Sequence, residues 1–185
     1  MTKPQSIDGF FRFHAPTFRA GSLLDIDVDL LVQLGIKAVL LDMDNTLSSW
    51  RGIKIAADST ALVQRLHAAG MKLAVFSNNG KAKVGGLACR LGIDVAIANA
   101  GKPKKSAFIR AARLMGVPPA ACCVVGDQLM TDIVGGNKAG FGATILVPPL
   151  SGHEWVFTKY NRMREAYVLK KTKQAPNKPL YFGKY

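Results

Sequence analysis

Short apolar runs alternate with amphipathic segments along most of this 185-residue chain. The runs have the composition of strands and end at polar residues or prolines; they lie at residues 39–41, 72–77, 94–97, 122–125 and 143–147. The amphipathic segments have apolar residues at helical spacing and lie at residues 27–34, 58–70, 81–91, 103–115 and 129–138. Strands that alternate with helices in this way predict βαβ units, and therefore an α/β fold with a parallel sheet and helices on both faces.

Two carboxylates follow the first of these apolar runs. Asp42 and Asp44 come directly after Val39–Leu41, where the carboxyl end of a parallel strand meets the crevice above the sheet. Extended geometry would place both side chains on one side, and two close carboxylates favour a bound cation or a shared proton. This predicts a hard-metal site with a second carboxyl for proton transfer. The alternative is a polar strand end, in which Asp44 or Asn45 starts a turn or caps a helix.

Length and composition indicate one ordinary domain with appended segments. The 49% hydrophobic content argues against disorder. No run approaches the roughly 18 consecutive apolar residues of a membrane-spanning helix, and the start has no apolar region of the secretory kind. Cys89, Cys122 and Cys123 are odd in number and lack metal-ligand spacing, so we expect core or surface residues in a reducing compartment. We therefore expect a cytoplasmic protein without a transmembrane segment.

Positive charge is the unusual part of the composition. The net charge is +13, and residues 151–185 hold eight basic side chains against two acidic ones. This bias predicts an anionic partner, such as a phospholipid surface, a nucleic acid or a phosphorylated substrate. Residues 9–19 alternate aromatic and basic side chains. They could lie at a membrane interface, stack on bases, or pack their Phe rings on the domain.

Other polar side chains follow the later apolar runs: Ser77 and Asn78, then Lys102, then Asp127 and Asp132. Because the carboxyl ends of parallel strands converge on one crevice, we expect these side chains to be neighbours of the two acids. A phosphate ester needs its oxygens neutralised, a nucleophile in line and a proton for the departing alkoxide. A hydroxyl, an ammonium group and a metal on the acids would meet these needs. Considered singly, each residue could equally be a turn residue, a solvated loop lysine or a helix N-terminal acid.

These residues resemble the motifs of the haloacid dehalogenase superfamily. The four motifs occur in order as Asp42-Met-Asp-Asn-Thr-Leu47, Ser77-Asn78, Lys102-Pro103 and Gly126-Asp-Gln-Leu-Met-Thr-Asp132. Residues 23–27, 133–140 and 158–162 are more narrowly similar to subfamily IIIA phosphatases of the YqeG type. The resemblance covers residues 18–165 and implies a Rossmann-like fold.

The resemblance also implies a role for each motif residue. Asp42 would be the nucleophile and form an aspartyl-phosphate. Asp44 would protonate the leaving group and deprotonate the attacking water, while its backbone carbonyl joins the metal shell. The Mg²⁺ ligands would be Asp42, Asp44 and Asp127, with Asp132 in an outer position or against Lys102. Ser77, Asn78 and Lys102 would bind the substrate phosphate.

The spacing of the motifs leaves no room for a cap domain. The intervals from Leu47 to Ser77 and from Ser77 to Lys102 are each filled by one helix and one strand. An open site suits a phosphate presented by something large or by a membrane surface. Some relatives in organelles act on phosphatidylglycerophosphate, so that anionic phospholipid is the leading substrate hypothesis, with a peripheral position on the inner face of the membrane.

Two alternatives remain open at this point. One is a soluble sugar-phosphate or nucleotide phosphatase. The other is an RNA- or ribosome-associated binding protein, which the charge alone supports, since no nucleic-acid-binding motif is found. The chain divides into an aromatic and basic N-terminal segment at residues 1–23, a phosphatase core at 24–150, and a C-terminal helix, near 153–171, with a basic tail to residue 185.

Overall fold

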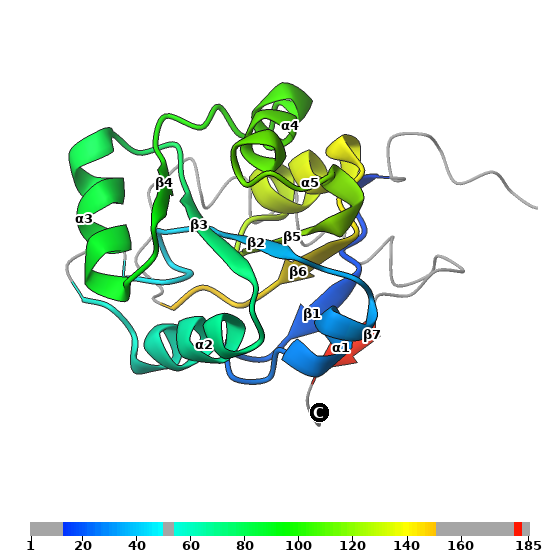
Figure 1. The fold of residues 1–185 in the computed structure, drawn as a ribbon, viewed down its shortest axis with the longest axis horizontal. Coiled ribbons are helices and arrows are strands. Elements are labelled where there is room, and N and C mark those ends of the chain that lie inside the picture. The colour runs from blue at the N-terminus through cyan, green and yellow to red at the C-terminus, as the bar shows by residue number, and fades with distance from the viewer. Residues whose placement is uncertain (1–12, 50–53, 151–179, 183–185) are drawn as a thin grey trace, which may run out of the picture.

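The chain folds around a parallel β-sheet with helices on both faces (Figure 1). The computed structural model describes residues 13–49, 54–150 and 180–182, and these form seven strands in the order β4-β3-β2-β5-β6-β1-β7. The strands are β1 (Phe18–Ala20), β2 (Ala38–Leu41), β3 (Lys72–Phe76), β4 (Val95–Ile97), β5 (Cys122–Gly126), β6 (Ala143–Leu146) and β7 (Leu180–Phe182). The α-helices are α1 (Val28–Gln33), α2 (Ala57–Ala68), α3 (Lys81–Leu91), α4 (Lys105–Leu114) and α5 (Val134–Ala139).

The sheet separates two apolar layers. In β2, Val39 and Leu41 pack with α2 and α3, whereas Leu40 packs with α4 and α5. Successive side chains of a strand point to opposite faces, so a strand covered on both faces must be apolar throughout. Every residue of β2 and β5 is buried. This is why these central strands appear in the sequence as uninterrupted apolar runs.

The predicted α/β fold is confirmed, and so is the absence of a cap domain among the described residues. Only α2 fills the described part of the interval between β2 and β3, and α3 fills the one between β3 and β4. Two details differ from the expectation. The helix expected from Pro103 begins at Lys105, and the helix expected from Leu129 starts with a π-helical turn (Leu129–Ile133) before α5. Among the described residues, no helix has both the length and the apolarity to cross a bilayer.

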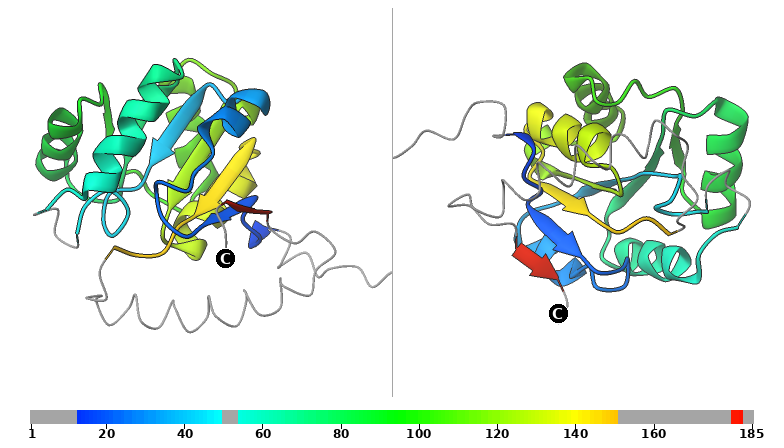
Figure 2. Two further views of the ribbon diagram at one scale, coloured as in Figure 1. Left: turned by 90° about the horizontal axis from the view of Figure 1, so that it is seen from below. Right: turned by 180° about the vertical axis from the view of Figure 1, so that it is seen from behind.

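β1 and β7 were not expected from the sequence. β1 lies within residues 1–23, and it pairs with β6 on one side and β7 on the other (Figure 2). The Phe18 ring stacks on Phe182 with centroids 4.5 Å apart. Both strands have only three residues, and unlike β4 they lie in the terminal segments, outside the alternation of apolar runs and helices that predicted the other strands. The sheet therefore takes a strand from each terminal segment, while the helix expected near 153–171 lies outside the described residues.

Close packing of α5 against α4 depends on Gly135. A Cβ atom at this position would lie 2.1 Å from Cε2 of Phe108. The Phe108 ring is fully buried and makes edge contacts with Phe76 and Phe141, at centroid distances of 4.8 and 5.5 Å. With a ring on either side, Phe108 has little room to move.

We predict that Gly135→Ala lowers the free energy of unfolding by about 1–3 kcal/mol, because the added methyl group overpacks the core. Gly86→Ala is the matched control, since a Cβ at this exposed position of α3 meets nothing within 4 Å. The control should gain about 0.5–1 kcal/mol through higher helix propensity. Urea unfolding measures both values, and equal destabilisation by the two variants would contradict the packing argument.

Candidate active site

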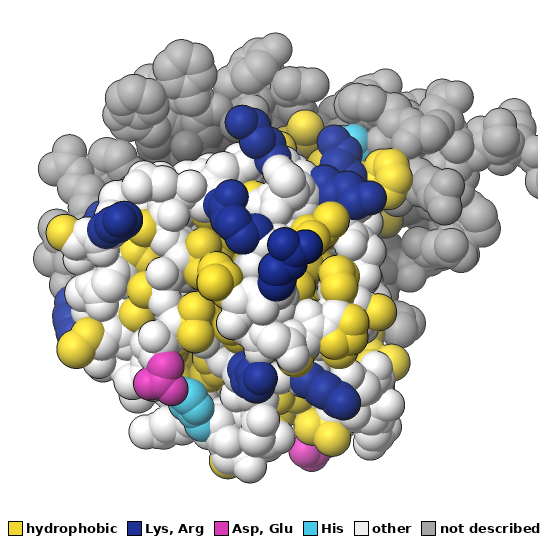
Figure 3. Space-filling model, turned by 45° about the horizontal axis from the view of Figure 1, so that its top comes forward, with side chains coloured by type: hydrophobic (Ala, Val, Ile, Leu, Met, Phe, Trp, Pro, Cys, Tyr) yellow, Lys and Arg dark blue, Asp and Glu magenta, His cyan; other side chains and the backbone are white. Residues whose placement is uncertain are grey.

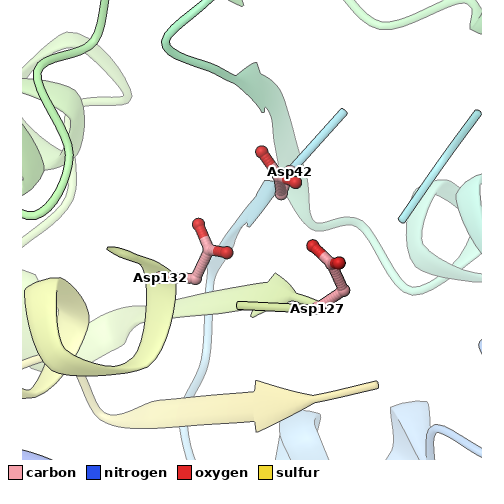
Figure 4. Close-up of side chains that lie close together, drawn as sticks. All are labelled: Asp42, Asp127 and Asp132. Carbon is pink, nitrogen blue, oxygen red and sulfur yellow. The ribbon is translucent and has the colours of Figure 1, made fainter. Parts of the chain in front are cut away.

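Three buried aspartates meet at the carboxyl edge of the sheet. Asp42 follows β2, Asp127 follows β5, and Asp132 lies in the π-helical turn after β5. Each offers one ligand oxygen, and these oxygens all lie within 4.8 Å of one another (Figure 4). β2 and β5 are paired neighbours, and the Asp42 N–H donates to the Val125 carbonyl at 2.9 Å. Strand pairing therefore brings residues far apart in the sequence into one cluster.

Lys102 neutralises part of this cluster. Its Nζ lies 2.5 Å from Asp42 Oδ1 and 2.7 Å from Asp132 Oδ1, and the Lys102 side chain is only 4% exposed. Burial lowers the pKa of Lys102, but the charges of Asp132 and Asp42 outweigh burial and raise that pKa above its ordinary value. Burial raises the pKa of the Asp42 carboxyl to about 6, although the Lys102 charge lowers it. Lys102 therefore stays protonated and forms ion pairs with Asp42 and Asp132.

The cluster has the chemistry of a divalent-cation site. Its three carboxylates provide only oxygen donors, and oxygen ligands favour hard cations. Three carboxylates against one ammonium group leave negative charge in excess, and buried like charges repel each other. A bound divalent cation would remove that repulsion. Asp42, Asp127 and Asp132 therefore fit a divalent cation.

Ser77 and Asn78 follow β3 at the same edge. Ser77 is buried, and its Oγ accepts hydrogen bonds from the backbone and the side chain of Asn79 at 3.2 and 3.0 Å. Asn78 Oδ1 accepts from the N–H groups of Gly101 and Lys102, both at 2.9 Å, and its Nδ2 donates to the Lys102 carbonyl at 3.2 Å. Asn78 thus fixes the loop that presents Lys102, and its side chain is engaged there rather than with the acid cluster.

Asp44 lies outside the three-acid cluster. Its Oδ2 accepts a short hydrogen bond from Asn79 Nδ2, and its Oδ1 pairs with Lys83 Nζ at 2.9 Å. Its side chain is 24% exposed, against 8% for Asp42. Asn45 has a φ of 60°, so the backbone turns directly after Asp44, as the turn alternative required. The structure thus places Asp132, expected in an outer position or against Lys102, beside Lys102 and within the three-acid cluster. It directs the Asp44 carboxylate towards α3.

Sequence reasoning missed Asn79 and Lys83, which hold the Asp44 carboxylate. Asn79 directly follows Ser77 and Asn78 after the second apolar run, and this position was its only signal. Lys83 lies in the first turn of α3 and had no signal, because its contact with Asp44 depends on how α3 packs.

A family model described as haloacid dehalogenase-like hydrolase matches residues 48–140, about half of the chain. The chain is 32% identical over 163 residues to the probable phosphatase YqeG of Bacillus subtilis, covering 88% of this chain and 94% of that protein. The chain belongs to the haloacid dehalogenase-like hydrolase family.

A second curated relative of this haloacid dehalogenase-like hydrolase is also a phosphatase, and a solved structure shares its fold. It is 31% identical over 179 residues to phosphatidylglycerophosphate phosphatase 1, chloroplastic/mitochondrial, of Arabidopsis thaliana, covering 91% of this chain and about half (51%) of that enzyme. The cobalt-bound deoxy-D-mannose-octulosonate 8-phosphate phosphatase of Haemophilus influenzae shares the fold, with a TM-score of 0.51 and 16% identity over 77% of this chain and 94% of that one. The predicted family and the prediction of a phosphatase are confirmed.

Gly126 allows Asp132 to reach the cluster. A Cβ atom at Gly126 would lie 2.4 Å from Cγ and Oδ2 of Asp132 and 2.7 Å from its Cβ. The π-helical turn brings Asp132 this close to β5, and its carboxylate then reaches Lys102. A side chain at position 126 would displace one acid of the cluster.

We predict that Gly126→Ala weakens binding of a divalent cation by about 10-fold or more. The added methyl group would push the Asp132 carboxylate away from Lys102 and the other two acids, so that it no longer supports the cation site. The variant should also unfold more easily by about 1–3 kcal/mol. Calorimetric titration with Mg²⁺ and thermal unfolding measure the two effects. In an Asp132→Ala background, Gly126→Ala should cause a smaller additional loss of cation affinity and stability. Two of the three Asp132 atoms that crowd position 126, Cγ and Oδ2, are then absent. Fully additive losses would contradict the steric explanation.

Proposed function

We propose that this protein is a Mg²⁺-dependent phosphatase that forms an aspartyl-phosphate on Asp42 and removes the terminal phosphate of phosphatidylglycerophosphate. The observation that carries the chemistry is the position of Asp42. Its carboxylate lies at the end of a central strand, held by Lys102 and close to two further buried acids. Hydrolysis of a phosphate monoester is among the slowest uncatalysed reactions, so a nucleophile, an acid and charge neutralisation must act together.

The proposed hydrolysis has two steps, and each uses Asp42 and Asp44, whose side-chain contacts are described above. In the first step, an Asp42 oxygen forms a bond to phosphorus while the bond from phosphorus to the leaving oxygen breaks. Asp44 gives that oxygen a proton. In the second step, water attacks the phosphorus of the aspartyl-phosphate, Asp44 accepts a proton from the water, and the Asp42 carboxylate is released with inorganic phosphate.

Charge neutralisation accompanies both steps. Lys102 and Ser77 bind the phosphoryl oxygens, and Asn78 keeps Lys102 in place through its loop. Asp42, Asp127 and the carbonyl of Asp44 would hold Mg²⁺, which when bound would supply positive charge for the phosphoryl oxygens. Asp132 holds the Lys102 ammonium group at 2.7 Å.

Three observations support the lipid substrate. A relative that is 31% identical is a phosphatidylglycerophosphate phosphatase. The described part of the chain has no cap domain over the site, so a phosphate on a large or surface-bound molecule has access to it. The net charge of +13 favours an anionic surface.

We predict phosphate release from phosphatidylglycerophosphate in vesicles, and loss of this activity in Asp42→Asn by a factor of about 10⁴ or more, because the nucleophile is gone. EDTA should abolish turnover reversibly, with recovery on addition of Mg²⁺. Asp94→Asn is the matched control, since it makes the same chemical change at an exposed position before β4. Phosphate release measures all four cases.

Other results would overturn parts of this proposal. Activity confined to soluble sugar phosphates or nucleotides would refute the lipid substrate. Unchanged rates in Asp42→Asn or in EDTA would refute the mechanism. RNA binding with a steep salt dependence and no phosphatase activity would favour a binding protein.

We predict that Asn79→Ala lowers kcat for an alkyl phosphate about 10-fold, because Asp44 loses one of the two groups that orient it as the acid. The defect should be smaller for p-nitrophenyl phosphate, since nitrophenolate leaves without needing a proton. Asp44→Asn should show the same pattern with a larger loss, about 10²–10⁴-fold. Asn79→Ala should have little further effect in that background. Equal losses on both substrates would exclude this role for Asn79.

A further inference from the structure

Four lysines border the open side of the site, and we call them the lysine rim: Lys81, Lys83, Lys104 and Lys105. The first pair lies at the start of α3 and the second at the start of α4. The loops before these helices touch, because the Asn99 N–H donates to the Asn79 carbonyl at 2.8 Å and Asn78 clamps the Lys102 loop. Both helix starts therefore lie at the edge of the sheet that carries the acids.

The rim has direct connections to the site. Lys83 Nζ contacts Asp44, and Lys104 is two residues from Lys102, whose ammonium group contacts Asp42. Lys81, Lys104 and Lys105 are exposed, whereas the Lys83 side chain is 34% exposed. The rim therefore lies beside the side chains that would receive a phosphate.

Little negative charge offsets the rim. The sequence has no acidic residue between Asp58 and Asp94, nor between Asp94 and Asp127. Among the described residues, no acidic side chain forms an ion pair with Lys81, Lys104 or Lys105. Figure 3 shows Lys and Arg side chains gathered on the face that α4 covers, with few acidic groups among them. The rim thus continues into a broadly positive surface.

The position of the rim lysines is unfavourable for the helices themselves. The N-terminus of a helix carries partial positive charge, so acids stabilise it and lysines do not. α1 follows this rule with a capping Asp27 and with Asp29 in its first turn, and α2 has Asp58 there. α3 and α4 have no acid in their first turns and no side-chain cap. α5 also lacks an acid and a side-chain cap, but among the described α-helices only α3 and α4 have lysines in their first turns. These are the two helices whose starts lie near the acids, where positive charge can attract an anion.

We propose that the lysine rim is a docking surface for an anionic phospholipid bilayer, which places the open site against lipid headgroups. The assignment of a lipid substrate to this surface rests on the proposed function, but docking itself can be measured without any substrate. Charge complementarity selects the bilayer, since each lysine close to an anionic leaflet strengthens binding roughly fivefold. Single-stranded nucleic acid fits less well, because no large apolar side chain exposed among the described residues is aromatic and could stack on a base.

The test replaces the three exposed rim lysines together in the full chain, as Lys81→Gln, Lys104→Gln and Lys105→Gln. Lys83 is kept unchanged, because it contacts Asp44. Cosedimentation with substrate-free vesicles of phosphatidylglycerol and phosphatidylcholine should show about 100-fold weaker binding than wild type. The ratio of phosphatidylglycerophosphate hydrolysis in these vesicles to p-nitrophenyl phosphate hydrolysis should fall as well. The Tm of the rim variant should rise by about 3 °C, because unfavourable positive charges are removed from the N-termini of two helices.

The matched control removes the same charge at the opposite edge of the sheet: Lys37→Gln, Arg90→Gln and Arg113→Gln together. Lys37 precedes β2, while Arg90 and Arg113 lie in the last turns of α3 and α4, and all three are exposed. This variant should keep at least a tenth of the wild-type affinity for the vesicles and the wild-type ratio of the two activities. Equal losses of vesicle binding in both triple variants would show an effect of net charge alone and overturn the proposal.

The outcomes separate docking from the proposed function. If wild type binds the vesicles through the rim but releases no phosphate from the lipid, docking stands and the lipid substrate fails. Wild-type binding to vesicles by the rim variant overturns docking, whatever the lipid activity. Retained vesicle binding with lost binding to single-stranded RNA would assign the rim to nucleic acid and overturn it too.

Discussion

The contact of one buried lysine with two buried aspartates is the interaction on which the site depends. Lys102 reaches Asp42 at 2.5 Å and Asp132 at 2.7 Å. The three residues come from the loop after β4, the end of β2 and the turn after β5, so the sheet must be assembled before they can meet. Loss of one partner would leave buried charge uncompensated, which destabilises a protein strongly. Assembly of the sheet is therefore what holds these three charged groups together.

Irregular backbone supports this interaction at two places. The π-helical turn and the missing side chain of Gly126 bring Asp132 close to β5, and π turns are frequent at functional sites. Asn78 supplies side-chain hydrogen bonds to the loop of Lys102. The regular strands set the approximate positions of the acids and the lysine, and these local features bring them into contact.

Most of the fold could be predicted because buried parallel strands are apolar throughout and alternate with helices. β2, β3, β4, β5 and β6 were expected near their observed positions. β1 and β7 were not, because these short strands lie in the terminal segments outside that alternation, and their pairing joins segments at opposite ends of the chain. The close placement of Asp42, Lys102, Asp127 and Asp132 also followed from the sequence, because each comes just after a strand or in the turn that follows one.

The sequence by itself determined the α/β class, the order of the motifs and the edge of the sheet at which they gather. Only the tertiary structure decided which side chains touch. It placed Asp132 beside Asp42 and Lys102. It directed the Asn78 side chain to the backbone of the Lys102 loop, and it paired the Asp44 carboxylate with Asn79 and Lys83. The physical reason is that a period along the chain fixes which face a residue occupies, whereas contact between two residues depends on strand order, helix packing and single turns such as that at Asn45.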